Sequence, residues 1–100
     1  MINKNSIIKM GTKFSLTELD KDYFLLPIST EGVAEEKLFS LNELGRFIVQ
    51  NIDGHTTVGE IIQKVHFTYQ EEFEIIESDT LLFINRLLDR GIVIMDNWGI

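Results

Sequence analysis

The side chains that could support chemistry in this chain are two histidines and a cluster of carboxylates, and neither set has the spacing of a known site. His55 and His66 lack the H-x-x-x-H spacing with which a helix binds zinc. The carboxylates lack the glycine and the ligand spacing of a calcium-binding loop. They are Glu71, Glu72, Glu74 and Glu77. We therefore expect no bound metal, and we expect this segment to be a solvated acidic linker between helices.

Other catalytic arrangements are also missing from the sequence. The chain has no cysteine, which excludes thiol nucleophiles, thiolate metal sites and disulfides. It has no glycine-rich phosphate loop, no G-x-S-x-G motif and no Ser/His/Asp order that indicates a catalytic triad. The sequence indicates a protein that is not an enzyme and needs no cofactor.

Composition narrows the class of partner. The 100 residues are 44% hydrophobic, which predicts one domain with its own core over residues 1–100. The formal net charge is -7 and residues 71–79 contain no Lys or Arg, which disfavours nucleic acid because phosphate binding depends on cations. No apolar run is long enough for a signal peptide or a membrane span. We expect a soluble, cytoplasmic protein with no membrane partner.

The elements that must position any site are three strands followed by three helices. Strands are predicted at residues 14–19, 23–28 and 37–41, with a charged turn at residues 20–22. Apolar and polar side chains alternate in the first and the third, and aromatic and branched side chains fill the second. Pro27 has no N–H to donate, so it ends the second strand or faces outward. Residues 92–95 are a candidate terminal strand, and residues 1–12 are expected to be frayed.

Capping residues mark the three helices. The first begins at an N-cap, Asn42, and ends at Asp53-Gly54. The second opens with the capping-box spacing of Thr57 and Glu60 and runs to about Tyr69. The third covers residues 76–90, and its core stripe consists of Thr80, Phe83, Ile84 and Leu87. This order predicts an α+β fold, a winged helix-turn-helix with a three-stranded antiparallel sheet followed by three helices.

An ordered set of short motifs resembles the PqqD family, named for the pyrroloquinoline quinone biosynthesis protein D. The first set is Leu41-Asn42, Gly45, Asp53-Gly54, Thr57-Val58 and Glu60-Ile61. The second set is Tyr69, Asp79, Phe83, Leu87 and Gly91, and the strand YFLL at residues 23–26 is also similar. The resemblance covers roughly residues 14–93, with a longer loop at residues 29–35 and an extension at residues 96–100.

This resemblance implies a peptide-binding chaperone. Members of the family bind the leader of a ribosomally made precursor peptide and present it to a modifying enzyme, often a radical S-adenosylmethionine protein. The leader adds as a strand to the edge of the third strand, in a groove beside the third helix. Strand addition obtains affinity from main-chain hydrogen bonds and specificity from pockets for alternate side chains.

The candidate peptide-binding residues lie on that strand and that helix. The strand residues are Glu36, Lys37, Leu38, Phe39, Ser40 and Leu41. The helix residues are Leu81, Leu82, Asn85, Arg86 and Leu88. Periodicity does not tell which shoulder of the helix faces the sheet, and the strand edge has an alternative cover in its own loop or in residues 92–95.

Two further alternatives stay open. The predicted fold also suits a winged-helix DNA-binding transcriptional regulator, although residues 71–89 carry six acidic residues and one Arg. An edge strand can also pair with a second copy of the chain, which would give a homodimer.

Overall fold

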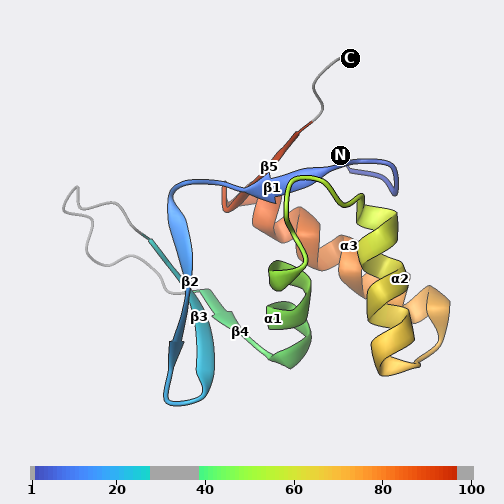
Figure 1. The fold of residues 1–100 in the computed structure, drawn as a ribbon, viewed down its shortest axis with the longest axis horizontal. Coiled ribbons are helices and arrows are strands. Elements are labelled where there is room, and N and C mark those ends of the chain that lie inside the picture. The colour runs from blue at the N-terminus through green and yellow to red at the C-terminus, as the bar shows by residue number, and fades with distance from the viewer. Residues whose placement is uncertain (1, 28–38, 97–100) are drawn as a thin grey trace.

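The computed structural model describes residues 2–27 and 39–96, and all statements on structure refer to these residues. The elements, in chain order, are β1 (Ile8–Met10), β2 (Phe14–Leu19), β3 (Asp22–Pro27), β4 (Phe39–Leu41), α1 (Glu43–Gln50), α2 (Val58–Tyr69), α3 (Phe73–Asp89) and β5 (Val93–Met95). Figure 1 shows α1 between the sheet of β2, β3 and β4 and helix α2, with α3 running from the α2 side toward β5 and with β1 and β5 across one end.

The three-stranded sheet is antiparallel, with β3 between β2 and β4. A two-residue turn joins β2 to β3, because Leu19 pairs directly with Asp22. Both turn residues, Asp20 and Lys21, have positive φ (54° and 74°), as a type I′ hairpin turn requires. The sheet is the one that the sequence predicts. Pro27 is the last residue of β3, and Ile28, Lys37 and Leu38 lie outside the described residues.

Two of the predicted helix starts are confirmed by their caps. The side chain of Asn42 accepts a hydrogen bond from the N–H of Gly45 (2.8 Å). Thr57 and Glu60 form both hydrogen bonds of the capping box. The end of α1 at Gln50 comes before the predicted stop at Asp53-Gly54.

The acidic segment differs from its predicted form as a linker. Helix α3 begins at Phe73, so Glu74, Glu77 and Asp79 are helical. Of the acidic residues in this segment, only Glu71 and Glu72 lie between α2 and α3. The cap residue Glu72 makes no side-chain capping hydrogen bond, so the sequence carries no signal for this start. Glu77 forms an ion pair with Lys4.

The N-terminal segment is packed, so the prediction that residues 1–12 are frayed is wrong for the described residues 2–12. Strand β1 pairs antiparallel with β5, with Lys9 opposite Ile94. The N–H of Val58 donates to the carbonyl of Ser6 (2.8 Å), which fixes this segment to the start of α2. The terminal strand predicted at residues 92–95 is therefore present as β5, and its partner is β1 rather than the edge of β4.

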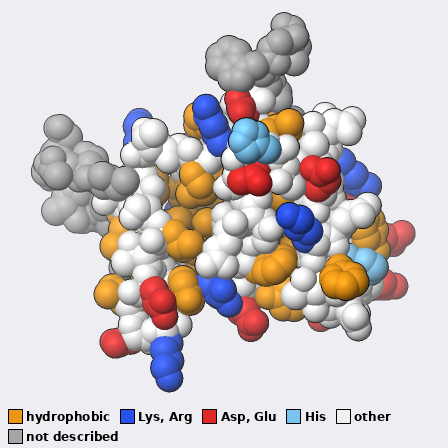
Figure 2. Space-filling model, viewed as in Figure 1, with side chains coloured by type: hydrophobic (Ala, Val, Ile, Leu, Met, Phe, Trp, Pro, Cys, Tyr) orange, Lys and Arg blue, Asp and Glu red, His pale blue; other side chains and the backbone are white. Residues whose placement is uncertain are grey.

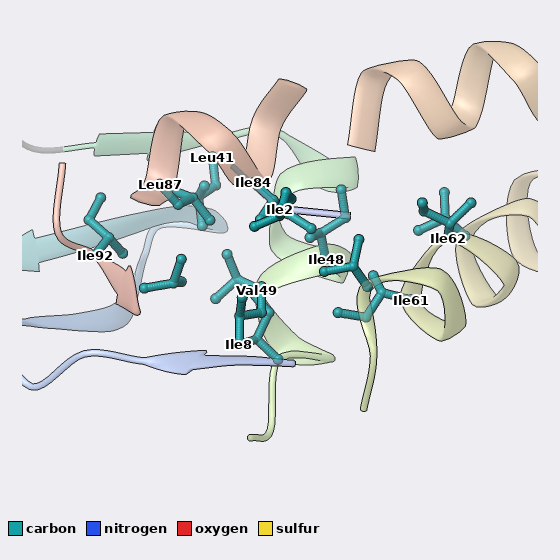
Figure 3. Close-up of a cluster of buried hydrophobic side chains, with 14 of the residues drawn as sticks. Ile2, Ile8, Leu41, Ile48, Val49, Ile61, Ile62, Ile84, Leu87 and Ile92 are labelled. Atoms are coloured by element: carbon teal, nitrogen blue, oxygen red, sulfur yellow. The ribbon is translucent and has the colours of Figure 1, made fainter. Parts of the chain in front are cut away.

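One hydrophobic core joins these elements. Its buried side chains come from all three helices and from strands of both sheets, and Figure 3 shows them pointing toward one another. Its fully buried members include Ile8 of β1, Ile48 of α1, Ile61 of α2 and Ile84 of α3. On α3, Thr80, Ile84 and Leu87 are fully buried and Phe83 is partly buried, close to the predicted core stripe.

These observations confirm an α+β fold in which a three-stranded antiparallel sheet precedes three helices. The winged helix-turn-helix arrangement of those helices stays a prediction. No helix in the described part of the chain is long and apolar enough to span a membrane.

Asp53 organises the turn before α2. Its carboxylate accepts hydrogen bonds from the N–H of His55 and the N–H of Thr56, both at 2.8 Å, and from the Thr56 hydroxyl at 2.9 Å. These hydrogen bonds lower the pKa of Asp53 from 3.8 to about 2 because they stabilise the ionised form, and the one from the His55 N–H has the largest effect.

We expect acid to weaken this turn. Because the folded-state pKa is lowered, the stability that Asp53 contributes is present above pH 3.8 and is lost as the pH falls toward about 2. Urea unfolding over this pH range should show that the free energy of unfolding falls less with acid in Asp53→Asn than in the unchanged chain. Ser78→Ala, on the exposed side of α3, removes no ionisable group, so it is the control and should leave the profile unchanged. An NMR titration midpoint near 3.8 for the Asp53 carboxyl would contradict this prediction.

Candidate functional site

Strand β4 is an edge strand in the described part of the chain, where it pairs only with β3. Leu19 and Asp22 flank the two-residue turn, so they form a hydrogen-bonded pair, and the pairs alternate from there along β3. Tyr23 and Leu25 of β3 therefore exchange hydrogen bonds with Leu41 and Phe39 of β4. It follows that the N–H and C=O of Ser40 point away from β3, toward the open side of the sheet.

Helix α3 lies against the inner face of β4 through aromatic contacts. The rings of Phe39 and Phe83 meet edge to face, with centroids 6.3 Å apart. The guanidinium of Arg90 lies over the Phe39 ring, 5.0 Å from its centroid. These contacts place the C-terminal half of α3 beside the start of β4.

Gly45 lets α1 approach this junction closely. A Cβ at this position would lie 3.2 Å from a Leu41 methyl group and 3.2 Å from the Phe83 ring, which is tighter than ordinary side-chain contact. Asn42 follows β4 directly and caps α1, so it alone joins the strand to the helix.

Two adjoining hollows lie where β4 gives way to α1, and we call them together the α1–α3 groove. The first, of about 220 Å³, is lined by Asn42, Leu44, Gly45, Ile48, Asp79, Leu82, Phe83 and Arg86. The second, of about 400 Å³, is lined by Asn42, Glu43, Leu44, Val65, Tyr69, Glu71, Ile76 and Asp79. The two hollows share Asn42, Leu44 and Asp79, so they lie next to each other.

The predicted helix residues fall on two different shoulders of α3. Leu82 and Arg86 line the α1–α3 groove. At about 100° per residue, Arg86 lies roughly 120° to one side of Thr80, whereas Leu81 and Leu88 lie roughly 100° to the other side. Leu81 and Leu88 are partly buried against the core, so they and Asn85 do not join Leu82 in one wall. The shoulder that faces β4 is the one with Phe83 and Arg90.

The predicted strand residues are partly described. Leu41 is buried, Phe39 is partly buried and Ser40 is exposed, in the alternation that the sequence predicts. Glu36, Lys37 and Leu38 lie outside the described residues. Leu44 and Asp79 also line the groove although no sequence pattern points to them, and Phe83 of the predicted core stripe lines it as well. Among the predicted residues, the sequence signal for the groove is Leu82, an apolar side chain that is 57% exposed on α3.

The histidines and carboxylates form no shared site. His66 is partly buried, and its ring meets the Phe73 ring edge to face at 5.3 Å. His55 is exposed in the turn that Asp53 organises. No three of the described His, Asp and Glu side chains come together in a way that could hold a metal ion.

The shape and the lining of the groove suit an extended, partly apolar chain. Ser40 offers one main-chain donor and one acceptor, and the hollow beside Leu82 and Phe83 can take an apolar side chain. Figure 2 shows apolar side chains gathered over the sheet, with charged ones at the tip of the hairpin, where Asp20, Lys21 and Asp22 are exposed.

Comparison with known protein families finds one family that matches most of the chain. The matching family is described as coenzyme PQQ synthesis protein D (PqqD), and the match covers residues 23–93. No curated protein and no solved structure matches the chain. The matched span starts in β3 and ends in β5, so it contains β4, the three helices and every predicted site residue. Since the match covers most of the sequence, the chain belongs to the PqqD family, as its motifs predict.

Proposed function

We propose that this protein binds the leader of a ribosomally synthesised precursor peptide and presents it to a modifying enzyme. The leader adds to β4 as a fourth antiparallel strand and extends along the α1–α3 groove. The protein itself catalyses no reaction, in keeping with a family of accessory proteins in coenzyme PQQ synthesis. The enzyme partner belongs to the class that modifies such peptides, for example a radical S-adenosylmethionine protein, and both act in the cytoplasm.

The observation that carries this proposal is the outward direction of the Ser40 N–H and C=O next to a partly apolar groove. A strand edge supplies sequence-independent hydrogen bonds, and the groove supplies selection by side chain. An enzyme active site would instead need convergent nucleophile, base or metal-binding groups, and the α1–α3 groove is lined by none in such an arrangement.

No observation favours the DNA-binding alternative. The exposed side of α3 carries Glu74, Asp79 and Asp89. These carboxylates would meet phosphate groups of the same charge in a DNA groove. The second alternative, a homodimer through β4, would use the same strand edge. The titration below distinguishes it from leader binding.

The test is a titration with the synthetic leader encoded beside this protein's gene. We expect saturable binding, in the micromolar range or tighter by calorimetry, with NMR shifts at the amides of Phe39, Ser40 and Leu41 and at the Leu82 methyl groups. The Leu81 methyl groups, on the other shoulder of α3, are the internal control. Saturable binding that leaves β4 unmoved would refute strand addition. Shifts of the same amides on raising the concentration of the protein alone would indicate a homodimer instead.

A further inference from the structure

Acidic and basic side chains follow one another along the α1–α3 groove, and Asp79 lines both of its hollows. Glu43, Glu71 and Asp79 line the hollow near the N-terminus of α3. Arg86 lines the hollow beside Leu82, and Arg90 follows one turn later over the Phe39 ring. Asp79 and Arg86 form no ion pair with any other described residue, and both are exposed. Both charges are therefore available to a ligand.

The direction of a bound strand relative to these charges follows from the packing. The start of β4 at Phe39 contacts Phe83 and Arg90, whereas Asn42, just after β4, lines a hollow with Asp79 and Leu82. Helix α3 thus runs opposite to β4. A peptide that pairs antiparallel with β4, as β3 does, would run along α3 from Asp79 toward Arg90. Antiparallel pairing is also the slightly more stable arrangement.

The spacing of the charges matches the spacing of side chains on one face of a strand. Asp79 and Arg86 are separated by roughly 10 Å along the helix axis, and Asp79 and Arg90 by roughly 16 Å. Residues four apart in a strand are separated by roughly 13 Å and point to the same face as the residue midway between them. That midway residue falls near Leu82, the exposed apolar residue of the groove.

We infer that the bound peptide carries the pattern K/R-x-Φ-x-D/E in the N-to-C direction, where Φ is an apolar residue. The basic residue lies at Asp79, Φ fills the hollow at Leu82 and Phe83, and the acidic residue lies at Arg86 and Arg90. This inference rests on the proposed function and deepens it, because it assigns side-chain specificity and strand direction to the charged residues of the groove.

The test uses two synthetic decapeptides of identical composition. One places Lys before a central Leu and Glu after it in this pattern, and the other exchanges the Lys and the Glu. We expect the first peptide to bind roughly five- to tenfold more tightly than the second at low ionic strength. The NMR shift of the Ser40 amide, followed as each peptide is added to millimolar concentration, measures both affinities. The difference between them should shrink with added salt. The double variant D79K/R86E should reverse the preference. Its matched control is E74K/R46E, which changes the same charges at positions that line neither hollow of the groove.

The outcomes separate this inference from the proposed function. Equal binding of the two peptides, a preference for the exchanged order, or no shift of Ser40 with either would overturn the charge pattern. If the natural leader still shifts the β4 amides, the proposed function stands without it. If the natural leader also fails to bind, the proposed function falls as well.

Discussion

The variant Ser40→Pro is expected to lose most of its affinity for the leader peptide while keeping its fold. Ser40 is the central residue of β4, and its N–H and C=O point away from β3. Proline removes this N–H and places its ring where the leader strand approaches. The hydrogen bonds between β4 and β3 come from Phe39 and Leu41, so they are retained, and edge strands tolerate proline at such a position.

The loss should be roughly tenfold or more in dissociation constant. One hydrogen bond contributes about 0.5–1.5 kcal/mol, which alone weakens binding by up to about tenfold, and the obstruction by the ring adds to this. Calorimetry with the leader measures the change. Circular dichroism and the NMR spectrum of the free variant verify that the fold is intact.

The opposite edge of the sheet offers a matched control. Glu18 of β2 lies opposite Tyr23, next to the hydrogen-bonded pair of Leu19 and Asp22 at the turn. Because hydrogen-bonded and non-hydrogen-bonded pairs alternate, Glu18 and Tyr23 form a non-hydrogen-bonded pair, and the N–H of Glu18 points away from β3. Glu18→Pro therefore places the same lesion on the other edge of the same sheet. We expect leader binding to be unchanged in this variant. Equal losses in both variants would mean that proline acts through the sheet as a whole and not through the β4 edge.

Residues with local structural roles made most of this fold predictable from the sequence. Asn42 caps α1, Thr57 and Glu60 close the capping box of α2, and Gly91 has a φ of 74° just after α3. Each of these signals depends only on neighbours within a few residues. Several belong to the motifs that resemble the PqqD family, so the same residues predicted both the elements and the family.

The candidate site was less predictable, because its geometry depends on contacts between distant segments. Periodicity identifies the buried stripe of α3 but treats its two shoulders alike, so it grouped Leu81 and Leu88 with Leu82. The contact between Phe39 and Phe83 decides which shoulder faces β4. No local pattern encodes that contact, and the close approach at Gly45 that accompanies it shows only in the folded chain.

The pairing of β1 with β5 was missed for a related reason. Each strand has three residues, which is too short for an alternation to be recognised, and the partners come from opposite ends of the described chain. A sequence such as IIKM at residues 7–10 is therefore ambiguous alone. Its role is set by Ile8, which is fully buried in the core.

Replacement of Ile8 by Ala is expected to destabilise the protein by about 3 kcal/mol, within the range of about 2–5 kcal/mol for truncating a buried isoleucine. The side chain of Ile8 points into the cluster of helix side chains in Figure 3, and the described structure leaves it no exposed surface. Urea unfolding should show a lower midpoint with an unchanged slope. The midpoint temperature of thermal unfolding should fall by more than about 10 °C, since a loss of 1 kcal/mol lowers it by about 4–8 °C in a small domain.

The neighbouring residue supplies the control, because Lys9 lies in the same strand with its side chain exposed. Lys9→Ala keeps the backbone pairing with Ile94 and removes no buried atoms, so its effect should stay within about 0.5 kcal/mol. Unfolding of Ile8→Ala at the midpoint of the unchanged chain would mean that the Ile8 side chain is not packed in the core in solution. A large loss for Ile8→Ala alone would establish that the N-terminal strand, which precedes the residues matched to the PqqD family, is part of the folding unit that holds α1 and α2 in place.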